Sequence, residues 1–210
     1  MKESFEFWTA LANNNTDNLS TRFVANKDIT LFDVNFILKY VTPNTKILDL
    51  GSGTGIIINQ LYSNVQHITA VEPFAEFSQF IANTEKIKIV HTKVEDFVPD
   101  DNYYDLLTFF GMLQYLNEEE TNIVYNKYHK ALKTGGKIVV KHQFGINEDV
   151  FVSGFSKELN REYASHYRHI DKEVSMLKNN AYHNVEIIDI YPPEYNRWEN
   201  THFYAIVAEK

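Results

Sequence analysis

A strand-like run that ends in three closely spaced glycines constrains the fold of this chain more than any other feature. Residues 46–50 are followed by Gly51, Gly53 and Gly55, and then by a helix-like stretch over residues 56–63. Glycine lets the backbone bend tightly and approach a ligand closely, because no side chain intervenes. In an open α/β sheet this first turn faces the crevice at the carboxyl ends of the strands, where ligands bind. The pattern therefore predicts an α/β domain that binds a ligand at this turn.

The spacing of the glycines and of two acids restricts that ligand. A dinucleotide fingerprint, G-x-G-x-x-G, counted from Gly51, requires glycine at position 56, where this chain has Ile56. Asp49 would repel a pyrophosphate but can attract a cationic ligand. Glu72 lies 21 residues after Gly51, at the end of the next predicted strand, where a carboxylate can bind both hydroxyl groups of a ribose. These residues favour a nucleoside without phosphates.

Short apolar runs alternate with longer amphipathic stretches from about residue 45 onward. The apolar runs predict strands over residues 46–50, 67–72, 87–90, 104–110, 137–142, 185–191 and 202–208. The longer stretches predict helices over residues 56–63, 75–84, 118–132 and 172–182. Such alternation is typical of a mostly parallel sheet with helices on both faces. Because no helix separates the last two strands, we expect an antiparallel last strand to close a seven-stranded α/β sheet.

The remaining segments complete a single domain over residues 1–210. Helical spacing of apolar residues near 4–13 and 28–41 predicts an N-terminal helical extension. We expect this extension, residues 1–44, to form a cap or lid on the core, residues 45–210.

Composition excludes several classes of function. The chain has 20 basic and 28 acidic residues, a formal net charge of −8 and no run of Lys or Arg, so nucleic acid is not an expected partner. The absence of cysteine excludes disulfides, thiolate nucleophiles and Cys-ligated zinc, and the spacing of the histidines predicts no metal site. The N-terminus lacks a signal-peptide core, and the longest apolar runs are far shorter than the roughly 20 residues that span a bilayer. We therefore expect a cytoplasmic protein, monomer or homodimer, with a small-molecule substrate and no membrane partner.

Four segments carry a resemblance to one known family: Asp49-x-Gly51-x-Gly53-x-Gly55, Glu72, residues 105–116 (DLLTFFGMLQYL) and residues 132–137 (LKTGGK). In this order they resemble the class I S-adenosylmethionine-dependent methyltransferases of small-molecule type, over about residues 45–210. The resemblance implies the Rossmann-like methyltransferase fold, S-adenosyl-L-methionine as cofactor and S-adenosyl-L-homocysteine as product. It further implies transfer of a methyl group from a sulfonium to a nucleophile.

The resemblance also implies which residues bind the cofactor. The acidic glycine loop would surround the methionine part, and Glu72 the ribose. Where many members place an acid for the adenine amino group, this chain has Lys93, but the flanking residues 94–96 resemble a variant pattern that contacts adenine. Residues 20–23 are placed to fold over the cofactor, with Arg22 near its carboxylate. The predicted cofactor-binding residues are Asp49, Gly51, Ser52, Gly53, Gly55, Glu72, Pro73, Val94, Glu95, Asp96, Phe110 and Arg22.

Methyl transfer depends mainly on alignment of two reactants, and a base is needed only where the acceptor loses a proton. His142, at the end of the predicted fifth strand, is the candidate base, with a hydrogen bond to a loop as its alternative role. Gln114 and Tyr115 follow the fourth strand and are expected to line the methyl-transfer pocket. A core position is the alternative for Tyr115.

An insertion and the last loop supply the substrate candidates. Residues 145–170 are irregular and rich in Tyr, His and Arg, and a solvated helix face is the alternative reading of this stretch. The family implies that substrate specificity is added here, and Arg161 suits a phosphate or carboxylate. Trp198, between the last two strands, is placed to reach the same rim. The predicted substrate residues are Gln114, Arg161, Tyr167 and Trp198.

An acidic protein with an aromatic pocket that contains arginine favours a small polar acceptor. We expect methylation of an oxygen in a sugar, a sugar-phosphate or a related cell-surface precursor. A quinone-precursor O-methyltransferase is the second possibility, because the segment Thr92-x-Val94-Glu95 resembles that branch. Two further alternatives are a non-catalytic S-adenosylmethionine-binding relative and, disfavoured by Ile56 and Asp49, an NAD(P)-dependent oxidoreductase.

Overall fold

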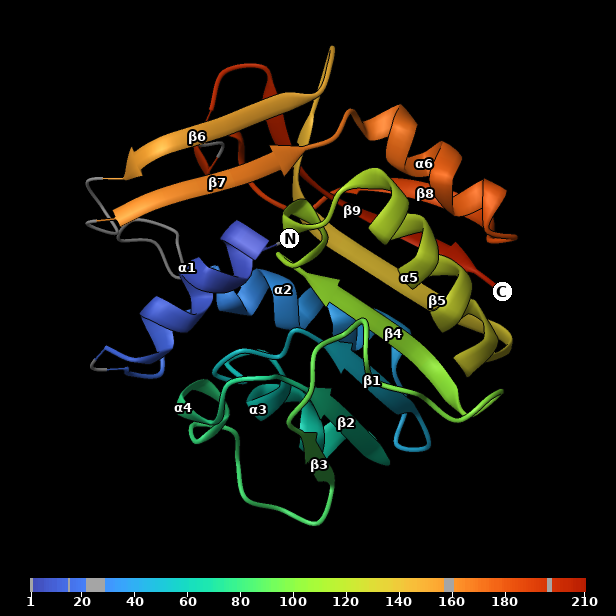
Figure 1. The fold of residues 1–210 in the computed structure, drawn as a ribbon. Coiled ribbons are helices and arrows are strands. Elements are labelled where there is room, and N and C mark those ends of the chain that lie inside the picture. Colours follow the sequence, from blue (N-terminus) through green and yellow to red (C-terminus); the bar gives the residue numbers. More distant parts are fainter. Residues whose placement is uncertain (1, 15, 22–28, 157–160, 196–197) are drawn as a thin grey trace.

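The computed structural model describes residues 2–14, 16–21, 29–156, 161–195 and 198–210. Its central feature is a seven-stranded sheet in the order β3-β2-β1-β4-β5-β9-β8 (Figure 1). The strands are β1 (Lys46–Leu50), β2 (His67–Val71), β3 (Ile87–Val90), β4 (Tyr104–Phe110), β5 (Leu132–Gly145), β8 (His183–Asp189) and β9 (Thr201–Glu209). Strands β1 to β5 pair in parallel, and β9 runs antiparallel to both β5 and β8. This arrangement confirms the predicted sheet, with the antiparallel strand last in the chain.

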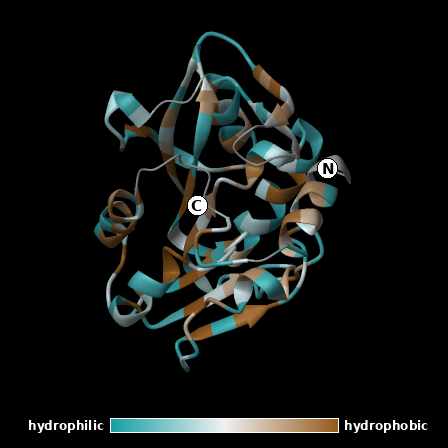
Figure 2. Cartoon of the chain, turned by 90° about the vertical axis from the view of Figure 1, so that its left-hand side faces the viewer, coloured by the Kyte–Doolittle hydropathy of each residue, from teal (hydrophilic) through white to brown (hydrophobic). Residues whose placement is uncertain are grey.

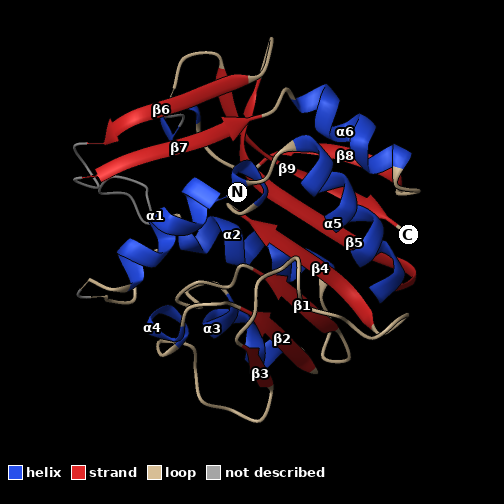
Figure 3. Cartoon of the chain, viewed as in Figure 1, coloured by secondary structure: helices blue, strands red, loops and turns tan. Residues whose placement is uncertain are grey.

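Helices cover both faces of this sheet (Figure 3). They are α1 (Lys2–Ala12), α2 (Thr30–Ile37), α3 (Ile58–Leu61), α4 (Ala75–Ser78), α5 (Glu118–Ala131) and α6 (Ile170–Asn179), with the 3-10 turns η1 (Leu38–Tyr40), η2 (Tyr62–Asn64), η3 (Leu113–Tyr115) and η4 (Pro193–Tyr195). Helix α5 begins with a capping box, in which Asn117 and Glu120 bind each other's backbone amides.

Two hydrophobic cores follow from strand geometry, because successive residues of a strand point to opposite faces. Leu48 packs with the residues of α5 and α6, whereas its neighbour Ile47 packs with those of α2 and α3. Strands covered on both faces are expected to be apolar at consecutive positions, as β1 is. Figure 2 shows the hydrophobic segments in the central strands and hydrophilic ones in many outer loops.

The segment 145–170 is regular in most of its described residues, 145–156 and 161–170, so the expectation of irregular structure was wrong there. It contains an antiparallel hairpin of β6 (Val150–Ser156) and β7 (Arg161–Tyr167), which forms a separate two-stranded sheet. A solvated helix face is therefore also excluded for these residues. Strand geometry sets Tyr163 and Tyr167 on one face of β7, because residues four apart in a strand share a face.

The helix predicted over residues 75–84 is a single turn, α4. The side chain of Asn59 explains the early end, because it takes two backbone groups that a longer helix would use. Its amide donates to the carbonyl of Phe80 at 2.9 Å and accepts from the amide of Ala82 at 2.8 Å. Such side-chain bonds compete directly with helical ones.

Within the described residues, none of the helices has the length and apolar character needed to cross a membrane. The same residues contain no group of three His, Asp or Glu side chains that could hold a metal ion.

Candidate active site

A cavity of about 280 Å³ lies at the carboxyl ends of β1, β2, β4 and β5. Helix α1 and strand β7 cover it, with Phe5 and Trp8 from the helix and Tyr163 and Tyr167 from the strand. Of the predicted cofactor residues, those that line the cavity are Asp49, Gly51, Ser52, Gly53, Glu72, Pro73, Val94, Glu95 and Phe110. The predicted catalytic and substrate residues that line it are Gln114, Tyr115, His142 and Tyr167.

The glycine turn forms the floor at one end of the cavity. The amides of Gly51 and Ser52 both donate to the carbonyl of Val71, at 3.0 and 3.1 Å, which ties the turn to β2. Gly53 has a φ of +55°, and a Cβ atom there would lie only 2.7 Å from Oγ1 of Thr21. This position therefore requires glycine for its backbone conformation and for the close approach of the N-terminal extension.

Gly55 has a different role from the one predicted. A Cβ atom at this position would lie 2.6 Å from Cγ1 of Ile81, and Gly55 does not line the cavity. The missing side chain allows residues 80–82 to pack against the turn. Asp96, another predicted cofactor residue, also lies outside the cavity lining.

Glu72 joins the end of β2 to the glycine turn. Its Oε2 accepts from the amide of Gly53 at 2.8 Å, and its Oε1 from the amide of Phe74 at 3.1 Å. Burial raises the pKa of Glu72 to about 7 against the lowering effect of these two bonds. Each carboxylate oxygen has a second lone pair, so the group can still accept hydrogen bonds from a diol in the cavity.

Asp49 gives the same end of the cavity a second acid. Thr108 on β4 donates to its Oδ1 at 2.5 Å. Burial raises the pKa of Asp49, while hydrogen bonds from Thr108 and Ser52 lower it. Two carboxyl groups, of which Glu72 is buried, have no basic partner among the described residues and make this end suited to a cation.

Residues that follow β3 in the chain line another side of the cavity. Val94 is buried and lines the cavity beside Glu95 and Lys93. The Val94 carbonyl is fixed by the hydroxyl of Tyr128 at 2.7 Å. Lys93 lies 3.8 Å above the ring of Phe5, so its charge faces an aromatic ring of α1.

His142 lies at the opposite end of the cavity, on β5. Its side chain is buried, and neither ring nitrogen has a hydrogen-bond partner among the described residues. A hydrogen bond to a loop, the alternative role for this residue, is therefore absent. Burial lowers the pKa of His142 well below its usual value, and the positive charges of Arg168 and Lys141 add to this effect. The imidazole is neutral at neutral pH and has a nitrogen ready to accept a proton.

Gln114 and Tyr115 reach the same end from η3. The Gln114 amide donates to the Tyr115 hydroxyl, but its Oε1 is buried without a partner. The Tyr115 ring lies edge-on to Trp8 at 5.5 Å and to Tyr163 at 6.4 Å. The Tyr163 and Tyr167 hydroxyls are 3.3 Å apart. Tyr115 is thus part of an aromatic wall, and it is not simple core filling.

Some predicted residues are not placed at the cavity. Arg22 and the side chain of Arg161 lie outside the described residues. Trp198 is 41% exposed and does not line the cavity, although its indole hydrogen bond lowers the pKa of Tyr167.

Trp8 and Tyr163 are among the lining residues that the predicted site did not include. The spacing of Phe5 and Trp8 by one helical turn was the available signal for α1, because such residues share a face.

Comparisons with known proteins agree with this geometry. A family model described as a methyltransferase domain matches residues 47–136. Over 148 residues, the chain is 27% identical to an uncharacterised methyltransferase of Bacillus cytotoxicus, with 65% of this chain and 69% of that protein covered.

Solved structures share the fold at low sequence identity. An S-adenosylmethionine-dependent methyltransferase of Leishmania major has a TM-score of 0.75 and 16% identity, over 98% of this chain and 82% of its own. The 1,6-didemethyltoxoflavin-N1-methyltransferase of Burkholderia thailandensis, solved with 1,6-didemethyltoxoflavin and S-adenosylhomocysteine, has a TM-score of 0.74 and 14% identity, over 98% and 85%.

Proposed function

We propose that the chain is a class I S-adenosylmethionine-dependent methyltransferase, which its fold and the match of residues 47–136 to a methyltransferase domain support, and that it methylates a hydroxyl oxygen of a small uncharged molecule. A sugar is the preferred acceptor. The observation that carries this proposal is the pair of unpartnered polar groups on His142 and Gln114 at the end of the cavity opposite to Glu72.

Buried polar groups without partners are costly, and in a native structure they call for an explanation. His142 presents one bare ring nitrogen that can accept a proton and one N–H that can donate, and Gln114 presents a bare amide oxygen. A ligand hydroxyl satisfies these atoms, because it donates to one group while it accepts from another. The site thus offers what an alcohol acceptor needs before and during loss of its proton.

The residues at the other end fit the cofactor. Glu72 keeps free lone pairs for the ribose hydroxyls, and Gly51 and Gly53 adopt the positive φ angles that bring the turn to the edge of the cavity. Val94 supplies an apolar contact for the adenine, and Asp49 supplies negative charge beside the methionine part. When bound, S-adenosylmethionine supplies an electrophilic methyl group on a positively charged sulfur.

The proton that the acceptor hydroxyl loses has one clear destination, a ring nitrogen of His142. The low pKa of His142 keeps this nitrogen unprotonated over the physiological range, so no competing proton blocks it. Gln114 and the tyrosine hydroxyls hold the rest of the acceptor, and the buried surroundings exclude water from the reacting atoms.

The charges around the cavity favour an acceptor without a phosphate. Of the described cationic side chains, Lys93 and Lys141 line the cavity. Lys141 forms an ion pair with Asp33 at 3.1 Å, and Lys93 lies over Phe5. A sugar-phosphate would therefore need a cation from outside the described residues, such as the side chain of Arg161.

A phenol of the quinone-precursor type is the second candidate acceptor. The edge-on rings of Trp8, Tyr115 and Tyr163 form a wall against which a flat ring can pack. The Burkholderia thailandensis methyltransferase of the same fold was solved with 1,6-didemethyltoxoflavin bound, which supports a small-molecule acceptor.

The test is label transfer from tritiated S-adenosylmethionine to three acceptor sets: free sugars, sugar-phosphates and dihydroxyphenols. We expect incorporation into the free sugars that depends on His142, with the exposed His183 as matched control (His142→Ala against His183→Ala). Labelling confined to the phenols would replace the preferred acceptor by the second one. Binding of S-adenosylhomocysteine without label transfer to any small-molecule pool would identify a non-catalytic relative, and binding of NAD in its place would refute the cofactor assignment.

A further inference from the structure

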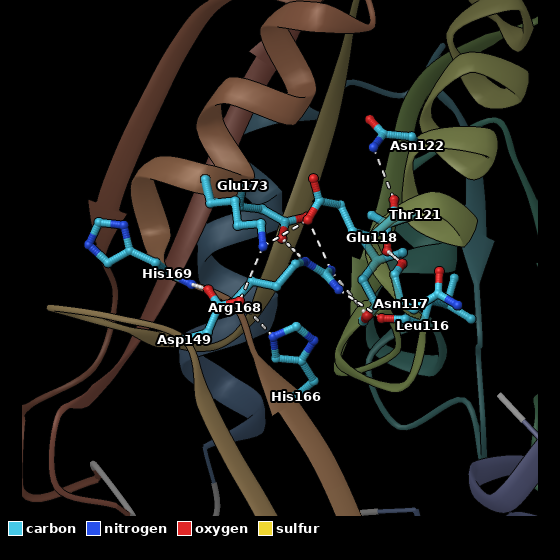
Figure 4. Close-up of polar contacts among 12 residues, drawn as sticks. Leu116, Asn117, Glu118, Thr121, Asn122, Asp149, His166, Arg168, His169 and Glu173 are labelled. Carbon is cyan, nitrogen blue, oxygen red and sulfur yellow. Dashed lines mark hydrogen bonds and ion pairs between the residues drawn. The ribbon is translucent and has the colours of Figure 1, made fainter.

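The side chain of Arg168 lies next to η3, at the end of the cavity that His142 and Gln114 line, which we call the acceptor end. Arg168 does not itself line the cavity. Arg168 follows β7 directly, and its side chain is 0% exposed. Its Nε donates to Oε2 of Glu173 on α6 at 2.5 Å. Figure 4 shows the guanidinium between Glu173 and Leu116. A buried guanidinium is tolerated only when its charge and its donors are matched, which Glu173 achieves for the charge.

Both terminal nitrogens of Arg168 also donate to the backbone of η3 and its C-cap, and Nη2 makes a second contact with Glu173, to Oε1 at 3.4 Å. Nη1 donates to the carbonyl of Leu116 at 2.8 Å, and Nη2 to the carbonyl of Leu113 at 3.1 Å. These two carbonyls flank Gln114 and Tyr115, the residues that η3 presents to the cavity. A 3-10 turn of three residues has few bonds of its own, here from the amides of Tyr115 and Leu116 to the carbonyls of Met112 and Leu113.

We infer that Arg168 is a positioning residue, which fixes η3 from below and thereby sets where Gln114 and Tyr115 meet the acceptor. The inference rests on the proposed function for the meaning of that position, but its structural part stands on the bonds of Arg168. The flat fork of a guanidinium can hold one carboxylate and two carbonyls at once, and an ammonium cannot do so in the same geometry.

Arg168 also links η3 to the other walls. Glu173 accepts a hydrogen bond from Tyr125 on α5, so the arginine connects α5, α6 and η3 at one point. It directly follows Tyr167, whose hydroxyl lies 3.3 Å from that of Tyr163. The hairpin and η3, which supply facing parts of the aromatic wall, are therefore held by the same side chain.

A neighbouring cluster provides a matched control. Lys172 pairs with Glu118 at 2.7 Å and with Asp149 at 3.2 Å, and its side chain is 37% exposed. Asp149 in turn accepts from the amide of His169 at 2.7 Å and contacts His166 at 2.9 Å. This cluster fastens the base of the hairpin to α5 and α6 but does not touch η3.

The experiment compares Arg168→Lys, Arg168→Met and the control Lys172→Met by amide hydrogen exchange. In both Arg168 variants we expect residues 111–117 to exchange at least about tenfold faster, with residues 46–50 within twofold of the unaltered protein. Lys172→Met should leave residues 111–117 unchanged. Unchanged exchange at 111–117 in Arg168→Lys, equal loss of protection across the chain, or the same effect from Lys172→Met would each overturn the inference.

A histidine titration by NMR separates positioning from mere loss of stability. The groups whose positive charge lowers the pKa of His142 are Arg168, Lys141 and His166. Arg168→Met removes one of them and should raise the pKa of His142, whereas Arg168→Lys keeps the charge and should leave that pKa near its original value. A His142 titration that is the same in all variants would contradict this arrangement.

Two further measurements keep the test decisive. If both Arg168 variants fail to fold, arginine side-chain NMR of the unaltered protein decides: Arg168 should show slowly exchanging, non-equivalent Nη protons, and freely averaging ones would overturn the inference. S-adenosylhomocysteine affinity should stay within threefold in the variants, and a larger loss would mean that Arg168 does not act locally on η3. Failure of the unaltered protein to bind S-adenosylhomocysteine would instead refute the proposed function and leave the exchange result standing.

Discussion

Protonation of Glu72 should control cofactor affinity near neutral pH. Burial raises the pKa of this carboxyl to about 7 in the protein without ligand. Ribose hydroxyls donate to the ionised form and therefore lower the pKa of Glu72 in the complex. Binding then releases a proton, so affinity falls as the pH falls below 7. The ionised fraction drops from about 0.9 at pH 8 to about 0.1 at pH 6, which weakens binding about tenfold, or ~1.4 kcal/mol.

Replacement of Glu72 by glutamine should remove that pH dependence and lower affinity at every pH. A glutamine has one acceptor oxygen, so its NH₂ group would face the amide of either Gly53 or Phe74, both of which now donate to the carboxylate. The lost charge-assisted bonds predict a cost of about 1–3 kcal/mol in binding.

Isothermal titration with S-adenosylhomocysteine at pH 6, 7 and 8 measures both effects. The matched control is Glu95→Gln, because Glu95 also lines the cavity but accepts neither of these two amide bonds. We expect the control to keep the pH dependence of the unaltered protein. A Kd independent of pH in the unaltered protein, or the same pH dependence in Glu72→Gln, would refute the reasoning.

Three further outcomes are expected. His142→Ala should lower kcat by about 10²-fold or more and leave the Kd for S-adenosylhomocysteine within twofold; full turnover, measured against His183→Ala, would remove His142 as the base. Gly53→Ala should cost about 1–2 kcal/mol in urea unfolding, because its φ of +55° is strained for alanine and the new methyl group meets Thr21. Asn117→Ala should cost about 1 kcal/mol in the same assay through loss of the α5 cap, and an unchanged midpoint would contradict the role of the capping box.

The fold and the residues that line the cavity beside Glu72 could be predicted because their causes are local. The glycine turn needs positive φ angles at Gly51 and Gly53, and the glycines at these positions indicate such angles from the sequence alone. The strands next to the turn are covered on both faces, so their consecutive apolar residues identify them as buried strands. Even here a local pattern was insufficient for Gly55, whose φ of +71° fits the motif but whose missing side chain leaves room for Ile81 and does not face the cavity.

The acceptor end could be predicted only in part, because its order comes from contacts between distant segments. Trp8 meets Tyr115, and Tyr115 meets Tyr163, across more than 40 residues of chain in each case. Arg168 was seen only as one member of a basic and aromatic cluster. Its burial depends on Glu173 and on two carbonyls of η3, and no spacing in the sequence indicates which carbonyls a guanidinium will bind.

Side chains of β5 alternate between the two faces of the sheet, and this alternation separates a lysine from a histidine at the cavity. Lys141 and His142 are neighbours, so their side chains leave the strand on opposite faces. Lys141 pairs with Asp33 of α2, while His142 lies on the face of α5 and α6, against Phe144. The charges that act on His142 are all positive, and none of its ring nitrogens meets a carboxylate among the described residues. A histidine paired with a carboxylate would be more basic and partly protonated near neutrality. The arrangement on β5 instead keeps a neutral imidazole at the cavity, where the acceptor is proposed to bind, and the register that pairs Phe110 with Lys141 decides which residue takes that place.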